Sequence, residues 1–127
     1  MRLVTREFIL NTINQKDKLY AGSQLRLCIP IINRIYRKML AGIKFTEIKV
    51  DNGLICDGHH RCIASLLANY NLSTIPCMRT SATKVVDWID VDFVAEDWDT
   101  PEKIYHLNEL DAEYSGITLF ELVKLLK

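Results

Sequence analysis

Two histidines and an arginine stand side by side in the segment Asp57-Gly58-His59-His60-Arg61. A short apolar run, 54–56, precedes this segment, and apolar residues recur at helical spacing over 63–70. The pattern predicts a strand, a tight turn at Gly58, and a helix whose first turn carries the three side chains. The first amides of a helix lack internal partners and lie at the positive end of its dipole. With Arg61 and the imidazoles as further donors, the segment suits a phosphate or another anion.

Each residue of this segment has a functional interpretation and a structural one. Arg61 is the expected anion clamp, because a guanidinium offers forked donors to phosphate; it could instead form an ion pair with Asp57. His60 could donate to a phosphate or shuttle a proton near neutral pH, or it could cap the helix start. Asp57 could hold a metal ion that bridges phosphates, orient a histidine, or cap the turn. We assign Gly58, His59, His60 and Arg61 to ligand binding, and Asp57 and His60 as catalytic candidates.

The same segment, followed by Thr74-Ile75-Pro76-Cys77-Met78, resembles the ParB/sulfiredoxin superfamily. The order there is a strand, a Gly-x-x-Arg turn, a helix, and a strand that opens on Ile-Pro. The resemblance covers roughly residues 43 to 79 and implies a ParB/sulfiredoxin-like fold and an anion site more strongly than a reaction. His59 stands where sulfiredoxin has its reactive cysteine, so sulfinic-acid reduction is not expected. The chain is also too short for the downstream DNA-binding domain of partition proteins, which argues against plasmid partition.

The resemblance implies a domain that binds a nucleotide or another phosphorylated small molecule. The cofactor implied is a nucleoside tri- or diphosphate with Mg²⁺, and any catalysis would be phosphoryl transfer or nucleotide hydrolysis. The sequence does not decide whether the chain is an enzyme. It also does not identify the carboxylate that would act as a base, for which Glu47 and the acidic residues of 87–99 are candidates. One alternative is a non-enzymatic interaction module, such as a toxin-neutralising or regulatory partner. A third alternative is a ParB-like nuclease, but the zero net charge of the chain argues against it.

Length and composition indicate a single domain over 1–127, with 49% apolar and 25% charged residues. No apolar run approaches the ~20 residues that span a membrane, and the N-terminus lacks a signal peptide's apolar core, so we expect a cytoplasmic protein. Residues 1–50 hold 10 Lys/Arg against 3 Asp/Glu, whereas residues 51–127 hold 6 against 13. We expect the halves to neutralise each other, and zero net charge argues against general nucleic-acid binding. The acidic stripe 87–99 is a solvated surface or a site for a protein partner.

The four cysteines, Cys28, Cys56, Cys62 and Cys77, are predicted to be free thiols, mostly buried. Cys56, His59 and Cys62 are spaced three apart, which is a metal-ligand spacing. However, the glycine turn would scatter these side chains, and no second Cys-x-x-Cys pair completes four ligands. We therefore assign no metal site.

The rest of the pattern predicts an α+β fold, with a small mixed or antiparallel sheet and helices around it. Arg34, Arg37 and Lys38 are expected on an outer helix face, where they could touch an anion but are more commonly solvated. The motif helix should bury Ile63, Leu66, Leu67 and Tyr70. Further buried positions are expected at Ile89, Val91 and Phe93 on a strand, at Ile104 and Leu107 on one helix, and at Leu119, Phe120, Val123 and Leu126 on the last. Five helices are expected: from Thr5 to about Gln15, from Pro30 to Gly42, from the motif to Asn71, from Thr100 onwards, and after the capping box Thr118-x-x-Glu121. Strands are expected over 45–50, 54–56, 75–78 and 85–94, and a tight turn at 51–53 joins the first two.

Overall fold

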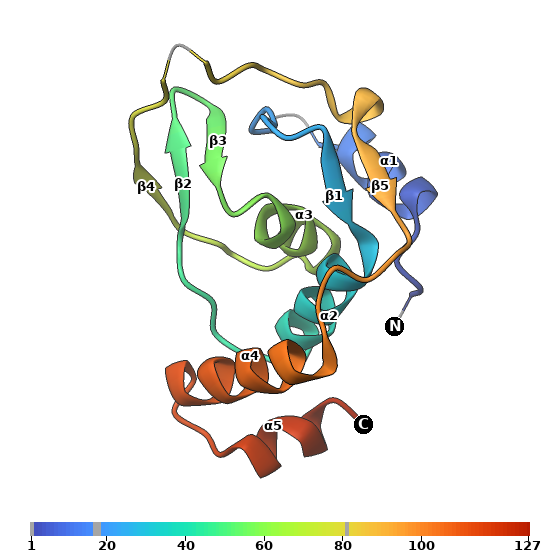
Figure 1. Ribbon diagram of the computed structural model, residues 1–127, viewed down its shortest axis with the longest axis vertical. Helices are drawn as coiled ribbons and strands as arrows, with labels where there is room; N and C mark the ends of the chain where they lie inside the picture. The colour runs from blue at the N-terminus through green and yellow to red at the C-terminus, as the bar shows by residue number, and fades with distance from the viewer. Residues whose placement is uncertain (1, 17–18, 81) are drawn as a thin grey trace.

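The computed structural model describes residues 2–16, 19–80 and 82–127, which form a mixed α+β fold with two small sheets (Figure 1). The helices are α1 (Arg6–Asn14), α2 (Ile29–Leu40), α3 (His59–Ala68), α4 (Pro101–Tyr114) and α5 (Leu119–Leu125). The strands are β1 (Arg26–Cys28), β2 (Ile48–Asp51), β3 (Leu54–Asp57), β4 (Thr74–Pro76) and β5 (Asp92–Val94), and a 3₁₀ turn covers Trp88–Asp90. No helix of these residues is both long enough and apolar enough to cross a bilayer.

The larger sheet has the order β3-β2-β4. Strands β2 and β3 form the predicted antiparallel hairpin, whose turn places Asn52 and Gly53 in the left-handed region with φ of 50° and 83°. Strand β2 starts later than predicted, at Ile48, because the Phe45 amide donates to the Tyr70 hydroxyl oxygen instead of to a strand. Strand β4 pairs parallel to β2 at the sheet edge, which is the position expected for Pro76 because proline has no N–H.

The smaller sheet joins β1 and β5 in parallel. The sequence pattern did not predict β1, and it predicted one long strand over 85–94 where only β5 is regular. Val91 and Phe93 are buried as expected, but Ile89 is exposed because Trp88–Asp90 turns as a 3₁₀ helix. The Trp88 indole packs over Gly22 and its Nε1–H donates to the Tyr20 carbonyl, which bends the chain away from a strand.

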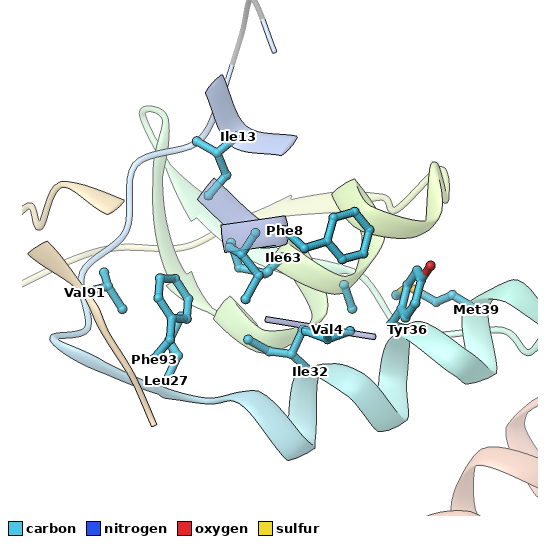
Figure 2. Packing of buried hydrophobic residues seen from close by; sticks show 12 residues of the cluster. Val4, Phe8, Ile13, Leu27, Ile32, Tyr36, Met39, Ile63, Val91 and Phe93 are labelled. Carbon is cyan, nitrogen blue, oxygen red and sulfur yellow. The ribbon is translucent and has the colours of Figure 1, made fainter. Parts of the chain in front are cut away.

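The main core lies between α1, α2, α3 and the small sheet (Figure 2). Thr5 caps α1 as predicted by accepting from the Phe8 amide, and Phe8 then meets Tyr36 edge to face at 6.0 Å between ring centroids. Helix α3 ends earlier than expected, at Ala68, because Asn69 takes a left-handed conformation. Of its predicted buried residues, Ile63 is fully buried, whereas Leu66, Leu67 and Tyr70 are half-buried against the core.

The basic face of α2 is covered, so the prediction that it is solvated was wrong. Arg34 makes a double ion pair with Asp97, at 2.6 and 2.9 Å, and also donates to Asp99. Lys38 is 4% exposed and lies 2.7 Å from the Asp111 carboxylate, while Arg37 donates to a backbone carbonyl of α5's C-terminal end. The two oppositely charged halves of the chain therefore neutralise each other across the fold, as expected.

Helices α4 and α5 form a hairpin at one end of the molecule, next to α2 (Figure 1). The predicted capping box at Thr118 and Glu121 is present. A small cluster of Ile43, Ala112 and Leu122 attaches the hairpin. The predicted inward face of α5 was right in part: Leu119 and Leu126 pack against this cluster, but Phe120 is 77% exposed, Val123 is exposed as well, and the fully buried residue is Leu122. On α4, Ile104 and Leu107 are only half-buried, because they face a cleft and not the core.

The prediction of four free thiols was also wrong, since Cys56 and Cys77 form a disulfide with a Cα–Cα distance of 6.9 Å. The Cys77 amide donates to the Val50 carbonyl, so the chain after β4 crosses the end of β2 towards β3. This contact depends on strand order, which cysteine spacing does not reveal. Cys28 and Cys62 are free and buried as expected, and burial raises the pKa of the Cys62 thiol to about 12.

Candidate ligand-binding cleft

Gly58 joins β3 to α3 with φ of 97°, a conformation that favours glycine. A Cβ atom here would lie 2.5 Å from the Ile48 Cγ2 atom and 2.9 Å from Arg61 Nη2. Since Ile48 is fully buried beneath the turn, the close approach requires glycine as well. The strand, glycine turn and helix expected from the sequence are therefore present.

The first turn of α3 lines a cleft of about 1200 Å³. The Cys62 amide donates to the Gly58 carbonyl at 2.9 Å, so the amides of His59, His60 and Arg61 precede the first helical hydrogen bond. Helices α2 and α4 supply further parts of the wall, including the charged Arg34, Lys38 and Asp111, and the segments 24–26, 44–46 and 98–99 complete it. All five residues of the 57–61 motif line this one cleft.

His59 is 2% exposed, and its Nε2 accepts a hydrogen bond from the Ser23 amide at 2.9 Å. Burial lowers the pKa of His59, although the charge of Asp57 opposes the shift. A neutral ring that accepts through Nε2 carries its proton on Nδ1. This Nδ1 atom is buried and has no hydrogen-bond partner among the described residues. His59 therefore holds an unused donor at the helix start.

His60 repeats this arrangement, with its Nε2 accepting from the Cys28 amide at 3.0 Å. Its ring meets the Trp98 ring edge to face, with 5.6 Å between centroids. Burial and the neighbouring His59 lower the pKa of His60 to about 4, against the opposing charge of Asp99. The ring is therefore neutral at pH 7, and the role of His60 in shuttling a proton stays a prediction. What His60 offers there is an Nδ1–H donor.

Arg61 makes the ion pair with Asp57 that was the structural alternative, at 3.4 Å. Its Nη1 also donates to the carbonyl and hydroxyl oxygens of Thr46. These contacts occupy three of the five guanidinium N–H groups, so two stay available. The Arg61 side chain is 21% exposed and that of Asp57 65% exposed. Arg61 is thus fixed at the cleft wall with donors to spare, and Asp57 lies at the rim.

The acidic stripe 87–99 does not act as one surface. Asp97 and Asp99 pair with Arg34, and this hydrogen bonding lowers the pKa of the Asp97 carboxyl. Within the stripe, Trp98 and Asp99 line the cleft, whereas Asp87 and Asp90 border a separate hollow of about 800 Å³. Glu47 is not among the residues that line the cleft. Asp57 and Asp99 are therefore the carboxylates beside the turn.

Sequence reasoning missed Ser23, Cys28 and Thr46, which hold the three donor side chains through backbone or hydroxyl contacts. They have no distinctive spacing relative to the motif, so no local signal could have found them. Among the described residues, no three His, Cys, Asp or Glu side chains gather as a metal site. The suggested trio is separated, because Cys56 is disulfide-bonded and Cys62 is buried inside α3.

The site thus combines helix-start amides, two neutral imidazoles and a fixed guanidinium with one exposed carboxylate. Donors outnumber acceptors at this end of the cleft, which suits an anionic group. Comparisons of the chain with protein-family models, with curated proteins and with solved structures found no match.

Proposed function

We propose that the cleft binds a nucleotide or another phosphorylated small molecule, with a phosphate at Gly58 to Arg61. The observation that carries this proposal is the pair of histidines that both accept a backbone amide through Nε2. Their protons are consequently on Nδ1, where they add to the helix-start amides and to the spare N–H groups of Arg61.

The size and lining of the cleft support a ligand larger than phosphate alone. Ligand sites typically measure about 300–1,000 Å³ and are mostly apolar with a few placed polar groups. Here aliphatic side chains of α2 and α4, Ile31, Ile35, Ile104 and Leu107, form part of the wall, together with charged side chains of the same two helices. A base or another weakly polar group would bury its faces against this wall.

We further propose that the fold is ParB/sulfiredoxin-like. Support comes from the order of β3, the Gly58 turn, α3 and the edge strand β4, which contains Ile75 and Pro76. This order matches the arrangement on which the sequence resemblance rests.

If the protein is an enzyme, we propose phosphoryl transfer or nucleotide hydrolysis, which depend on positioning and charge neutralisation. Mg²⁺ is commonly held by one or two carboxylates together with ligand phosphates, and the exposed Asp57 fits that role. His60 would donate to a phosphate oxygen. Asp99 is almost fully buried and paired with Arg34 and Lys103, so it would not act as a base.

A non-enzymatic interaction module is the second candidate, and one observation favours it. Large apolar side chains are exposed on the α4–α5 hairpin, among them Tyr114, Phe120 and Leu125. Such exposure is typical of protein-binding surfaces when the side chains are contiguous. The nuclease alternative has no comparable support in the described residues.

A thermal-shift screen with ATP, ADP, CTP and GTP, with and without Mg²⁺, tests the proposal, because a ligand of the native state raises the melting temperature. Arg61→Ala should weaken binding by about 1.5–3 kcal/mol, roughly ten- to a hundredfold. Arg79→Ala is the matched control, since Arg79 also lies 3.4 Å from a carboxylate, Asp51, away from the cleft. Unchanged affinity in Arg61→Ala with a large loss of stability would make the arginine purely structural.

A further inference from the structure

The Cys56–Cys77 disulfide lies at a β-bulge, directly before the turn at Gly58. Between two successive pairs of the β2–β3 hairpin, the partner on β2 advances by one residue, whereas the partner on β3 advances from Ile55 to Asp57. Cys56 is therefore one residue too many for the ladder. A bulge leaves its extra residue unpaired and re-aims the side chains next to it, and bulges are frequent beside functional sites. Here the extra residue bonds to Cys77, and the side chains next to it belong to the candidate site.

Strand β3 is fixed by hydrogen bonds up to the bulge and by the disulfide at the bulge. The Ile55 amide donates to the Ala21 carbonyl at 2.9 Å, and the Ser23 hydroxyl donates to the Ile55 carbonyl at 2.8 Å. These contacts anchor the residue before the bulge without help from the disulfide. At the next residue, the bond to Cys77 is the covalent link that keeps Cys56 out of the ladder. Opening the bond therefore leaves the start of β3 in place and frees the register beyond it.

A hairpin without the bulge would present a different turn. In the regular register Cys56 would face Lys49, and Asp57 would move one position along the partner strand. A slip of one residue turns a side chain to the other face of a sheet, so Asp57 would leave its ion pair with Arg61. The turn at Gly58 would shift by about 3.3 Å, the rise of one strand residue. The two registers are thus two states of one element, and the bulged state is the one that places Asp57 beside Arg61.

The disulfide lies where a reductant can reach it. Both cysteines are half-buried, and Cys56 lines the hollow of about 800 Å³ beside Met78 and Arg79. Strand β4, which leads to Cys77 at the edge of its sheet (Figure 1), is exposed throughout. It pairs with β2 over three residues, and one of them, Pro76, has no N–H to donate. Accessible disulfides of this kind are the ones that undergo exchange with thiols.

We propose that the Cys56–Cys77 disulfide is a redox switch of the cleft: the oxidised protein binds a phosphate group, and the reduced protein binds it weakly. This inference rests on the proposed phosphate-binding function. A thiolate of a dithiol reductant attacks the Cys56 sulfur, forms a mixed disulfide and releases Cys77 as a thiolate. The second thiolate of the reductant attacks the reductant's own sulfur in that mixed disulfide, closes an internal disulfide and releases Cys56. Two electrons and two protons thus pass from the dithiol to the two cysteines, and the freed Cys56 joins the ladder.

Titration calorimetry with pyrophosphate and nuclear magnetic resonance of the hairpin test the switch. Dithiothreitol should weaken pyrophosphate binding at least tenfold and replace the cross-strand contact of Lys49 with Asp57 by one with Cys56; reoxidation should reverse both changes. The double variant Cys56→Ser/Cys77→Ser should bind as the reduced protein does and should not respond to dithiothreitol. Cys62→Ala is the control, since it removes a buried free thiol and keeps the disulfide; it should respond as the wild type does.

The outcomes separate this inference from the function on which it rests. Equal pyrophosphate affinity of folded oxidised and reduced protein overturns the switch and leaves the phosphate site standing. Weaker binding with the contact of Lys49 and Asp57 unchanged overturns it too, as does loss of the whole fold on reduction, because the bond would then be a general brace. If neither form binds pyrophosphate, the proposed function fails. The hairpin contacts then decide the switch alone: a change of partner on reduction supports it, and unchanged partners overturn it.

Discussion

Replacing Gly58 by alanine should be among the most destabilising changes of a single methyl group in this chain. The left-handed backbone at φ of 97° costs a non-glycine residue about 1–2 kcal/mol. The added Cβ would also lie 2.5 Å from the Ile48 side chain, which is fully buried and cannot move freely. Such overpacking typically costs a further ~1–3 kcal/mol. We expect Gly58→Ala to lower the free energy of unfolding by about 2–5 kcal/mol.

Gly53→Ala provides the matched control, because Gly53 has φ of 83° but a Cβ atom at this position would have no neighbour within 4 Å. It should lose only the backbone contribution, about 1–2 kcal/mol. Equilibrium urea unfolding measures both losses, provided that the slope with denaturant stays constant. Equal losses in the two variants would refute the close approach of Ile48 to the turn. The same clash reaches Arg61 Nη2, so phosphate binding should weaken in Gly58→Ala and not in Gly53→Ala.

Two further predictions concern acid stability and the disulfide. Because the pKa of His60 in the folded protein, about 4, lies below the value of about 6.5 in the unfolded chain, stability should fall as pH drops from 6.5 towards 4, by on the order of 2 kcal/mol. His60→Gln should lose part of this pH dependence in urea unfolding, whereas a change at the exposed His106 should retain it; identical profiles would contradict the assignment. Replacing Cys56 and Cys77 by serine should cost about 3 kcal/mol, from the 21-residue separation that the bond closes. Thiol titration of unfolded, unreduced protein should find two free thiols, and four would show that the bond is absent.

Local signals in the sequence predicted those parts of the fold that depend only on interactions between residues close together in the chain. The caps at Thr5 and Thr118, Pro30 in the first turn of α2, and the Asn52-Gly53 hairpin turn all formed as expected. Each is fixed by hydrogen bonds or backbone angles within a few residues. The three-residue strand β1 has no such signal, since pairing with β5 defines it. Lys38 was misassigned for the same reason, because its partner Asp111 comes from a distant helix.

The candidate site shows the same division. The turn at Gly58 and the helix start could be predicted, because strand, glycine and helical spacing adjoin in the sequence. Which ring nitrogen of each histidine carries the proton could not be predicted. It depends on hydrogen bonds from the amides of Ser23 and Cys28, which lie more than thirty residues away in the sequence.

The parallel pairing of β1 with β5 also has a consequence for the order of folding. Hairpin β2–β3 and helix α3 join residues close in sequence, whereas Arg26 pairs with Asp92, sixty-six positions further along the chain. Closing a long loop is entropically unfavourable and slows folding, so we expect the hairpin and α3 to form first. Rate changes for Val50→Ala in the hairpin and Phe93→Leu in β5 would test this order, with the hairpin change slowing folding more. The turn at Gly58 would then exist before α4 reaches it, and the complete cleft would be assembled only late in folding.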